Sequence, residues 1–413
     1  MKKKLLVSVL ALALLSGCGG ELYAPAGILG SKEPQSSSKL LGEPVALEQI
    51  TPNGLVLRLM KLESQKAQAS NVILSPLSIE MALGMAANGA AGEAAGAMET
   101  LLGMDAGQLN SLLGPYMARE DETLSIANSM WFQMDLKDWL NKDFLNTLSE
   151  VYGAQEGVFT PGSQAAADSI NGWVKEKTRG KIDSIVSVDS LTEDTLGILI
   201  NALYFNGKWA EPFEDWQVSE ELFHAPGGDQ KAQFMSQWLG TYFETEWGAG
   251  FAKDYEDGYE FIGLLPREEG PVDLSLLNID ELLATRTGAY DVEIKLPKFE
   301  LEYATSLVDT LTELGLGSLF EGHSLDSMLN DGALSGGMEA HISDVIHKTY
   351  MKMYEEGTEA AAATGIVVEC TSAAVLVERE KKQVYLDRPF AFLIRDTQSG
   401  QVVFCGIISS VEN

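Results

Sequence analysis

The sequence contains few of the residues that build active sites and metal centres: four histidines and three cysteines occur among 413 residues. No HExxH, G-x-S-x-G or G-x-x-x-x-G-K-[ST] pattern occurs, so no motif indicates a zinc protease, an α/β-hydrolase or a phosphate-binding loop. The histidines form no metal-ligand pattern. We therefore expect no metal, no cofactor and no enzymatic activity. A Ser/His/Asp triad assembled across the fold stays open, because triads are recognised by geometry.

Basic residues are also scarce, with 29 Lys and Arg against 60 Asp and Glu, and the formal net charge is −31. Such a protein is repelled by nucleic acid and by an anionic membrane surface. The charge indicates a solvated acidic surface that keeps the protein soluble. It could also steer basic proteases inward.

The N-terminal apolar run, Leu5 to Leu15, is too short to span a bilayer. It follows three lysines and ends in Leu15-Ser16-Gly17-Cys18, which resembles the bacterial lipobox. We expect residues 1–17 to be a lipoprotein signal peptide, Cys18 to carry the lipid, and residues 18–45 to form a flexible tether. The protein would then lie at the cell surface or in the periplasm, anchored to a bacterial membrane on its extracellular side. The alternative is an ordinary signal peptide with an incidental cysteine.

The rest of the chain, residues 46–413, reads as one large α+β domain. The hydrophobic fraction of the full sequence, 45%, is enough for a sizeable core, and no internal repeat or interior linker interrupts this domain. Helical periodicity occurs in Met98 to Leu113 and Trp139 to Tyr152, whereas Leu196 to Phe205 and Val402 to Ile408 have the pattern of strands. The apolar pattern around Cys405 indicates a small buried residue.

The most unusual segment follows a strand-like run and is rich in small residues from Gly357 to Ala363. Composition favours a short helix capped by Thr358, because alanine has the best helix propensity. Alternation favours a latent strand instead, since one face would carry no charge and both Glu359 and Glu369 would lie on the other. A strand of this kind could enter a sheet without burying a carboxylate.

Several segments in order along the chain resemble serpins, the serine protease inhibitor family. The segment EEGTEAAAAT from Glu355 resembles the hinge of the serpin reactive loop, and NVILSPLSIEMALGMAANGAAGE and NALYFNGKWAEPF resemble two further family segments. INGWVKEKTRGKI, LPKFELEY and DRPFAFLIRDTQSGQVVFCGII follow the same pattern. The similarity covers roughly residues 46 to 413.

This resemblance implies a helix bundle on a large central β-sheet with two smaller sheets and an exposed reactive loop, at about residues 355–386. It also implies covalent suicide inhibition of a serine protease. The protease cuts the loop and forms an acyl-enzyme, and the freed arm inserts into the central sheet. The hinge would comprise Glu355, Glu356, Gly357, Thr358, Glu359, Ala360, Ala361, Ala362 and Ala363.

The seventeenth residue counted from Glu355 is Thr371, so the resemblance implies cleavage at or near Thr371-Ser372. Cys370 is a neighbouring candidate, and a free thiol there would be open to oxidation unless it simply fills a protease subsite. These residues suit an elastase-like or subtilisin-like target. The loop is longer than is usual in the family, and further cut sites could lie at Val377, Arg379 or Lys381 in the added segment.

Four polar residues match the family's shutter region beneath the central sheet: Ser75, Ser78, Asn201 and His347. Hydroxyls, an amide and a neutral imidazole can form a buried network whose members exchange partners when strands part. Each could equally be a satisfied core polar group. Trp209 matches the tryptophan at the upper opening of the sheet, where its ring could also serve packing alone.

Some serpins bind heparin through a basic helix, but the corresponding stretch from Asp105 to Arg119 has Arg119 as its only cation, which argues against heparin as a partner. We expect a monomer whose partners are a serine protease and, through the lipid on Cys18, the membrane. Two other functions stay open: a non-inhibitory serpin acting as a surface binding protein, and a hydrolase or solute-binding lipoprotein.

Overall fold

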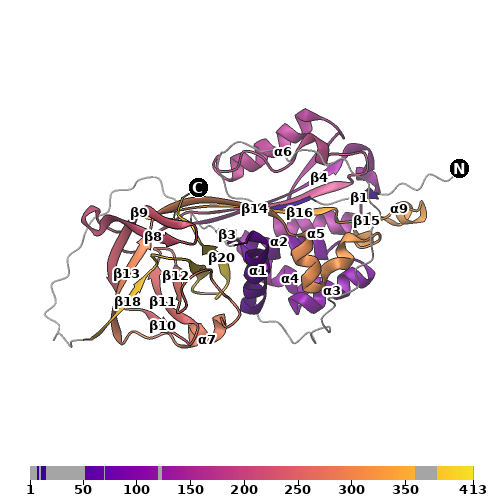
Figure 1. Ribbon diagram of the computed structural model, residues 1–413. Coiled ribbons are helices and arrows are strands. Elements are labelled where there is room, and N and C mark those ends of the chain that lie inside the picture. Colours follow the sequence, from indigo (N-terminus) through magenta and orange to yellow (C-terminus); the bar gives the residue numbers. More distant parts are fainter. Residues whose placement is uncertain are drawn as a thin grey trace, which may run out of the picture.

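The computed structural model describes residues 52–68, 70–119, 123–358 and 379–412, together with the backbone of residues 7–8 and 11–14. Long strands of the largest sheet cross the middle of the molecule, with α6 over one face and the cluster of α1 to α5 under the other (Figure 1). The helices are α1 (Pro52–Ala67), α2 (Pro76–Ala87), α3 (Gly92–Leu102), α4 (Ala106–Met117), α5 (Lys142–Tyr152), α6 (Gln164–Lys177), α7 (Ile279–Ala284), α8 (Val308–Leu311) and α9 (Asp331–Ser335).

The largest sheet has eight strands and mixes parallel with antiparallel pairing. In spatial order it contains β5 (Gln155–Phe159), β4 (Leu124–Gln133), β6 (Gly197–Phe205), β2 (Ala11–Leu14), β16 (Asp344–Tyr354), β17 (Gly357–Thr358) and β7 (Gly207–Lys208), with β14 (Phe299–Ser306) on the other edge of β16.

Two smaller sheets gather at one end of the molecule (Figure 1). One has the order β10 (Tyr242–Glu244), β11 (Gly248–Asp254), β12 (Tyr259–Pro266), β19 (Phe390–Asp396), β20 (Val402–Ile408) and β3 (Val72–Leu74). The other has the order β18 (Glu380–Tyr385), β13 (Tyr290–Pro297), β9 (Gly228–Leu239) and β8 (Val218–Ala225). A further pair joins β1 (Val7–Ser8) to β15 (Ala340–His341). The predicted α+β fold with one large and two smaller sheets is confirmed.

β6 lies between two cores because helices cover both faces of its sheet. Ile198 and Ile200 belong to the core beneath α6, whereas Leu199 and Leu203 face the larger core that contains α2. A strand covered on both faces reads as an almost continuous apolar run, and this is how β6 could be predicted from sequence. Its one strongly polar residue, Asn201, therefore needs a partner in the protein.

α2 is buried along almost its whole length and begins at a firm cap. Ser75 has extended backbone angles, its side chain accepts a hydrogen bond from the backbone N–H of Ser78, and Pro76 occupies the first helical position. Proline suits that position because its missing N–H would have no helical partner. The cap fixes the N-terminus of α2 against the underside of the largest sheet.

The segment from Met98 to Leu113 was predicted to be one helix, but it forms parts of two helices separated by a turn. α3 ends before Gly103, which adopts a left-handed conformation with φ of 67°. α4 then starts after Asp105, whose side chain forms a capping box with Gln108. Glycine past the end of one helix and aspartate before the next are strong boundary signals, and they override the apolar periodicity.

The largest sheet is parted between β6 and β16. At one end of the gap, β2 runs parallel to both strands, pairing with residues 344–347 of β16 and, through Ala13, with Ile200 of β6. At the other end, β17 pairs antiparallel with residues 353–354. β14 occupies the opposite edge of β16, so β2 and β17 share the edge that faces β6.

Between β2 and β17, no strand in the described part of the chain pairs with residues 348–352 on this edge. A narrow cavity lies there, lined by Tyr204 and Phe205 of β6 and by residues 350–352 of β16. The gap is therefore filled at both ends and open between them. Of the helices that the structure describes, none has the length and apolar character needed to cross a membrane.

Candidate functional site: the hinge and the strand gap

β17 comprises two residues of the predicted hinge, and both already belong to the largest sheet. Gly357 and Thr358 form an antiparallel ladder with residues 353–354 of β16 and with residues 207–208 of β7. A Cβ atom on Gly357 would lie 2.0 Å from the carbonyl oxygen of Gly207. Only glycine allows so close an approach of two backbones.

Thr358 is 3% exposed and lies against an aromatic stack. Its hydroxyl is 2.7 Å from the hydroxyl of Tyr255, which is fully buried, and burial raises the pKa of that phenol. The ring of Tyr255 stacks on Trp209 with centroids 4.3 Å apart and planes 9° apart. Thr358 itself is extended and paired on both sides, whereas the residues that would form a helix after it lie outside the described residues.

Trp209 contacts the hinge directly, at the position predicted for the opening of the sheet. Its indole Nε1 donates to the carbonyl oxygen of Tyr354 at 3.1 Å, and its backbone N–H donates to the carbonyl oxygen of Glu356 at 2.9 Å. The side chain is also fully buried, so the ring contributes to core packing, which was the alternative role left open from the sequence. Packing and contact with the hinge are two roles of the same ring.

Lys253 is a buried cation beside this stack. Its Nζ lies 5.3 Å from the ring of Trp209 and 4.5 Å from that of Phe213, and it donates to the carbonyl oxygen of Glu211 at 2.6 Å and to Oε1 of Gln237 at 2.5 Å. Burial lowers the pKa of Lys253 to about 8. The cation holds the aromatic rings beneath the hinge through cation–π contacts.

Glu355, the first hinge residue, forms an ion pair with Lys298 at 2.5 Å. Burial raises the pKa of Glu355, but the hydrogen bond from the Lys298 ammonium outweighs it, and the pKa lies below its ordinary value. The carbonyl oxygen of Glu355 also accepts from the backbone N–H of Phe213 at 2.9 Å. The turn between β16 and β17 is thus fixed by both backbone and side chain.

The four residues matched to the shutter form one connected network at the N-terminus of α2. Ser75 donates its backbone N–H to Nε2 of His347 at 3.2 Å, and its hydroxyl accepts from the N–H of Ser78. Ser78 in turn donates its hydroxyl to Oδ1 of Asn201. Since Asn201 lies on β6 and His347 on β16, α2 connects the two strands that β2 separates.

The network continues away from the gap through Asn128 of β4, which accepts from Nδ2 of Asn201 at 2.7 Å and donates to the carbonyl oxygen of Tyr152 at 2.7 Å. Ser75 also donates its hydroxyl to the carbonyl oxygen of Val403 in β20 at 2.8 Å. These partners were missed from the sequence, because a single asparagine in a strand carries no local signal of a distant partner.

His347 is fully buried, and burial lowers its pKa to about 3. The imidazole is therefore neutral at physiological pH, which is the form expected for a buried hydrogen-bond network. Because Nε2 accepts from Ser75, the ring proton belongs on Nδ1. Nδ1 has no hydrogen-bond partner among the described residues. A buried donor without a partner is unfavourable.

The other predicted site residues lie outside the described residues: Cys18, Glu359, Ala360, Ala361, Ala362, Ala363, Cys370, Thr371 and Ser372. The range predicted for the loop, 355–386, includes strand residues at both ends, because β18 begins at Glu380. Lys381 pairs with Asp291 of β13 and lies 5.2 Å from the ring of Trp238. A residue held in a ladder is a poor cut site, so Lys381 is corrected from loop to strand. Cys405 is buried in β20, as predicted.

None of the four histidines is hydrogen-bonded to a serine hydroxyl within the described part of the chain, so no catalytic triad is assembled there. His224 bonds to Asp229, and His323 to Asp326 and Glu339, all by ring nitrogens on the surface. The described residues also contain no group of three or more His, Cys, Asp and Glu side chains arranged to hold a metal ion. The site is built to hold strands.

A gap in a central sheet, with the first residues of a following segment already paired at its upper end, matches the family that the motifs resemble. A family model described as Serpin (serine protease inhibitor) matches residues 51–411. The chain belongs to the serpin family. The match extends over nearly all of the described residues.

This serpin is 31% identical to Iripin-8 of Ixodes ricinus in an alignment 382 positions long that covers 87% of this chain and 92% of that protein. It is 32% identical to the leukocyte elastase inhibitor of Bos taurus in an alignment 372 positions long that covers 83% of this chain and 93% of that protein. Among solved structures, native tengpin, a thermophilic serpin, has a TM-score of 0.73 and 31% identity, covering 91% of this chain and 96% of tengpin.

Proposed function

We propose that this serpin is a covalent inhibitor of serine proteases, cut at or near Thr371-Ser372. In this mechanism, the protease's serine hydroxyl attacks the carbonyl carbon of Thr371. The peptide bond breaks, Ser372 leaves as a free amine, and Thr371 stays esterified to the protease. The arm from Thr358 to Thr371 then inserts between β6 and β16 and carries the protease with it. Cys370-Thr371 is the neighbouring candidate bond.

The pairing of β17 is the observation that carries this proposal. Gly357 and Thr358 already occupy the upper end of the gap, so insertion needs only to continue a ladder that has begun. The lower end holds β2, which supports the idea that the space between β6 and β16 accepts an additional strand. Nucleation is the slow part of forming a ladder from an open loop, because loop closure costs entropy.

The register of β17 predicts which arm residues would face the core. Residue numbers in each pair of β16 and β17 add up to 711, so residues 360, 362, 364 and 366 would lie opposite 351, 349, 347 and 345. These odd-numbered positions of β16 are all buried. The inward positions of the arm are Ala360, Ala362, Thr364 and Ile366, none of them charged. Glu359 would face outward, opposite Lys352, as a favourable cross-strand pair.

The same register supports the position of the cut. Continued to the end of the arm, it brings Thr371 opposite Ala340 in β15, the last short strand before β16. Fourteen residues from Thr358 to Thr371 span about 45 Å when extended. A cut at Arg379 would leave eight more residues than this edge can take. Cleavage there would give a substrate more readily than an inhibitor.

The residues around the proposed bond are small, which favours an elastase-like or subtilisin-like protease with a small first pocket. One relative carries the name leukocyte elastase inhibitor, and this agrees with the first of those classes. We further propose that Cys18 is lipidated, so that the inhibitor acts while tethered outside the cytoplasmic membrane. Mass spectrometry of the protein purified from membranes, compared with a Cys18→Ser variant, tests the anchor.

The direct test mixes residues 19–413 with pancreatic elastase, subtilisin and trypsin, followed by denaturing gels and mass spectrometry. Covalent trapping predicts an SDS-stable complex and a released fragment that begins near Ser372. Clean cleavage with no complex and no loss of protease activity, across a wider protease panel, would contradict inhibition and leave a non-inhibitory serpin.

A matched pair of variants tests the insertion register. Ala362→Glu would place a carboxylate inward opposite buried Thr349, whereas Ala363→Glu would face outward opposite Lys348. We expect Ala362→Glu to raise the number of inhibitor molecules consumed per protease by about tenfold or more, because burying an unpaired charge slows insertion. Ala363→Glu should stay close to the parent. Equal effects of the two variants would show that the register is wrong.

A further inference from the structure

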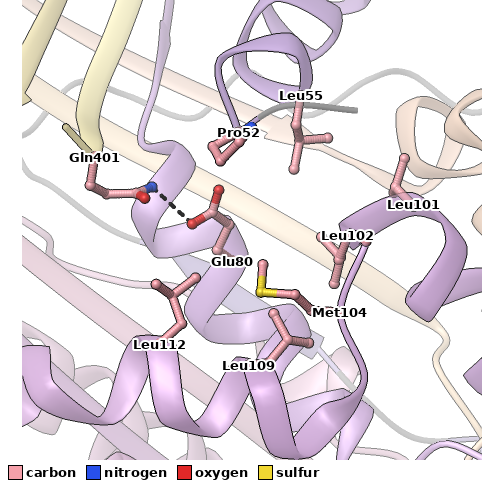
Figure 2. A pocket seen from close by; sticks show the side chains of 10 residues that line it. Pro52, Leu55, Glu80, Leu101, Leu102, Met104, Leu109, Leu112 and Gln401 are labelled. Carbon is pink, nitrogen blue, oxygen red and sulfur yellow. Dashed lines mark hydrogen bonds between the residues drawn. The ribbon is translucent and has the colours of Figure 1, made fainter. Parts of the chain in front are cut away.

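A cavity of about 390 Å³ lies on the helical side of the molecule, away from the strand gap. It lies where α1, α2, α3 and α4 approach the turn before β20, and half of the residues that line it are leucine (Figure 2). Leu101 and Leu102 come from α3, and Leu109 and Leu112 from α4. Concave, mainly apolar pockets of this size with a few polar groups are typical of sites for small molecules.

One acidic side chain points into this cavity. Glu80 of α2 is 7% exposed, and its Oε2 accepts a hydrogen bond from Nε2 of Gln401 at 2.8 Å. In Figure 2 the other carboxylate oxygen points away from Gln401 toward the space beside Pro52. That oxygen, Oε1, makes no hydrogen bond to a described residue.

No cationic side chain lines the cavity in the described part of the chain. Burial raises the pKa of Glu80 to about 7, although the hydrogen bond from Gln401 opposes this. Arg119 lies beside Tyr116, whose phenol also senses the charge of Glu80, but this cation is already paired with Asp396 at 2.7 Å. The carboxyl group therefore lacks a counter-ion, and a protein with net charge −31 attracts cations from solution.

We propose that this cavity binds a small amphiphilic cation, with its apolar body against the leucines and its ammonium group hydrogen-bonded to Oε1 of Glu80. Charge-assisted hydrogen bonds to a buried carboxylate are stronger than neutral ones, so an ammonium ligand is preferred to an alcohol of the same shape. The site shares no residue with the hinge or the shutter network. It stands whether or not the protein inhibits proteases.

The test uses two probes of the same shape, 1-adamantylammonium and 1-adamantanol, titrated calorimetrically into residues 19–413. We expect one site per chain, with the ammonium bound about tenfold or more tightly than the alcohol at pH 8. Glu80→Gln should remove about tenfold of the ammonium's affinity and leave that of the alcohol within about threefold. Equal affinity for both probes, or no binding of either at millimolar concentration, would overturn the proposal.

Two further variants separate the site from general effects. Met104→Trp fills the cavity from its edge and should weaken both probes by about tenfold or more. Glu99→Gln removes an exposed carboxyl on α3 and should change neither affinity. Circular dichroism and thermal unfolding check that each variant is folded. If Glu99→Gln lowered the affinity for the ammonium as much as Glu80→Gln, the binding would reflect net charge alone, and the proposed site would be wrong.

Discussion

The two ends of the strand gap are held by different kinds of interaction. At the hinge, β17 joins the sheet through backbone pairing, and Thr358 lies against the stacked rings of Tyr255 and Trp209. The turn before β17 is held by the ion pair of Glu355 with Lys298. At the shutter, β6 and β16 are apart, and α2 holds each of them by one side-chain hydrogen bond. Apolar packing is lost or kept as a whole, whereas polar partners can be exchanged singly.

This difference suggests a division of work during insertion. The hinge end gives a firm starting point for a growing strand, because Thr358 is buried and its hydroxyl bonds to that of Tyr255, which stacks on Trp209. The shutter end must admit the strand, and its polar groups can exchange hydrogen-bond partners one at a time as the strand enters. The comparison predicts that hinge substitutions act mainly on stability, and that shutter substitutions also act on pH dependence.

The largest effect is expected at the aromatic stack. Trp209→Ala removes a fully buried indole and should lower the free energy of unfolding by about 4 kcal/mol, from lost burial and the cavity left behind. Denaturant unfolding measures it. Trp216→Ala is the matched control, because that side chain is 81% exposed. If Trp209→Ala lowered the free energy of unfolding by less than about 1 kcal/mol, packing around Trp209 would not be what holds the hinge in place.

The second effect is a pH dependence that belongs to the shutter. Burial lowers the pKa of His347 to about 3 from an ordinary 6.5, so the unfolded chain binds this proton more readily. Stability is therefore complete above about pH 6.5 and falls as the pH drops toward 3, by about 3 kcal/mol at pH 4. We expect His347→Gln to lose this part of the acid dependence.

His323→Gln serves as the control for that experiment. His323 is exposed, and its hydrogen bond from Nδ1 to Asp326 raises its pKa, so it cannot produce a loss of stability toward acid. Denaturant titrations between pH 7 and pH 4 compare the three proteins. If His347→Gln kept the acid dependence of the parent, the loss would have to come from other groups.

A smaller effect should follow from cutting the network between α2 and β6. Ser78→Ala leaves Oδ1 of Asn201 buried without its donor and should destabilise the protein by about 2 kcal/mol. Ser64→Ala removes a solvent-exposed hydrogen bond from a hydroxyl to the carbonyl oxygen of Lys61 within α1, and should be close to neutral. Similar values for both serines would mean that the buried network contributes no more than a surface hydrogen bond.

The smallest effect is expected for the ion pair of the hinge. Both side chains of the Lys298–Glu355 pair are partly exposed, so a double-mutant cycle with Lys298→Met and Glu355→Gln should give a coupling below about 1 kcal/mol. Added salt should reduce it further. The more exposed pair of Lys352 and Glu300 provides the reference. A coupling of several kcal/mol would mean that charge, and not packing, stabilises the hinge, and the contrast with the shutter would be weaker.

Local sequence patterns predicted the strands reliably where a strand is buried on both faces and therefore forms a continuous apolar run. The run Val402 to Ile408 coincides with β20, and Leu196 to Phe205 differs from β6 by one residue at the start. Periodicity failed between Met98 and Leu113, because two helices in series kept the same apolar spacing across a turn. Backbone boundary signals outweigh periodicity at such a place.

Only the site residues that lie within recognisable sequence motifs could be predicted. Motif resemblance found the four shutter residues and Trp209, but their partners depend on the folded chain. Tyr255 is 103 residues away from Thr358, and Lys298 is 57 residues away from Glu355. The leucines around Glu80 look like any other core residues in sequence. Contacts of this kind have no local period, so only the three-dimensional arrangement reveals them.

A strand edge accepts one partner at a time, so β2 and the inserted arm exclude each other. β2 uses the edge of residues 344–347, which the proposed register assigns to residues 364–367 of the inserted arm. A chain that still has residues 11–14 in this position cannot complete the trap. Under the proposed lipidation of Cys18, which would remove residues 1–17, this edge would become free for the arm, and removal of the leader would then be the step that makes the inhibitor competent.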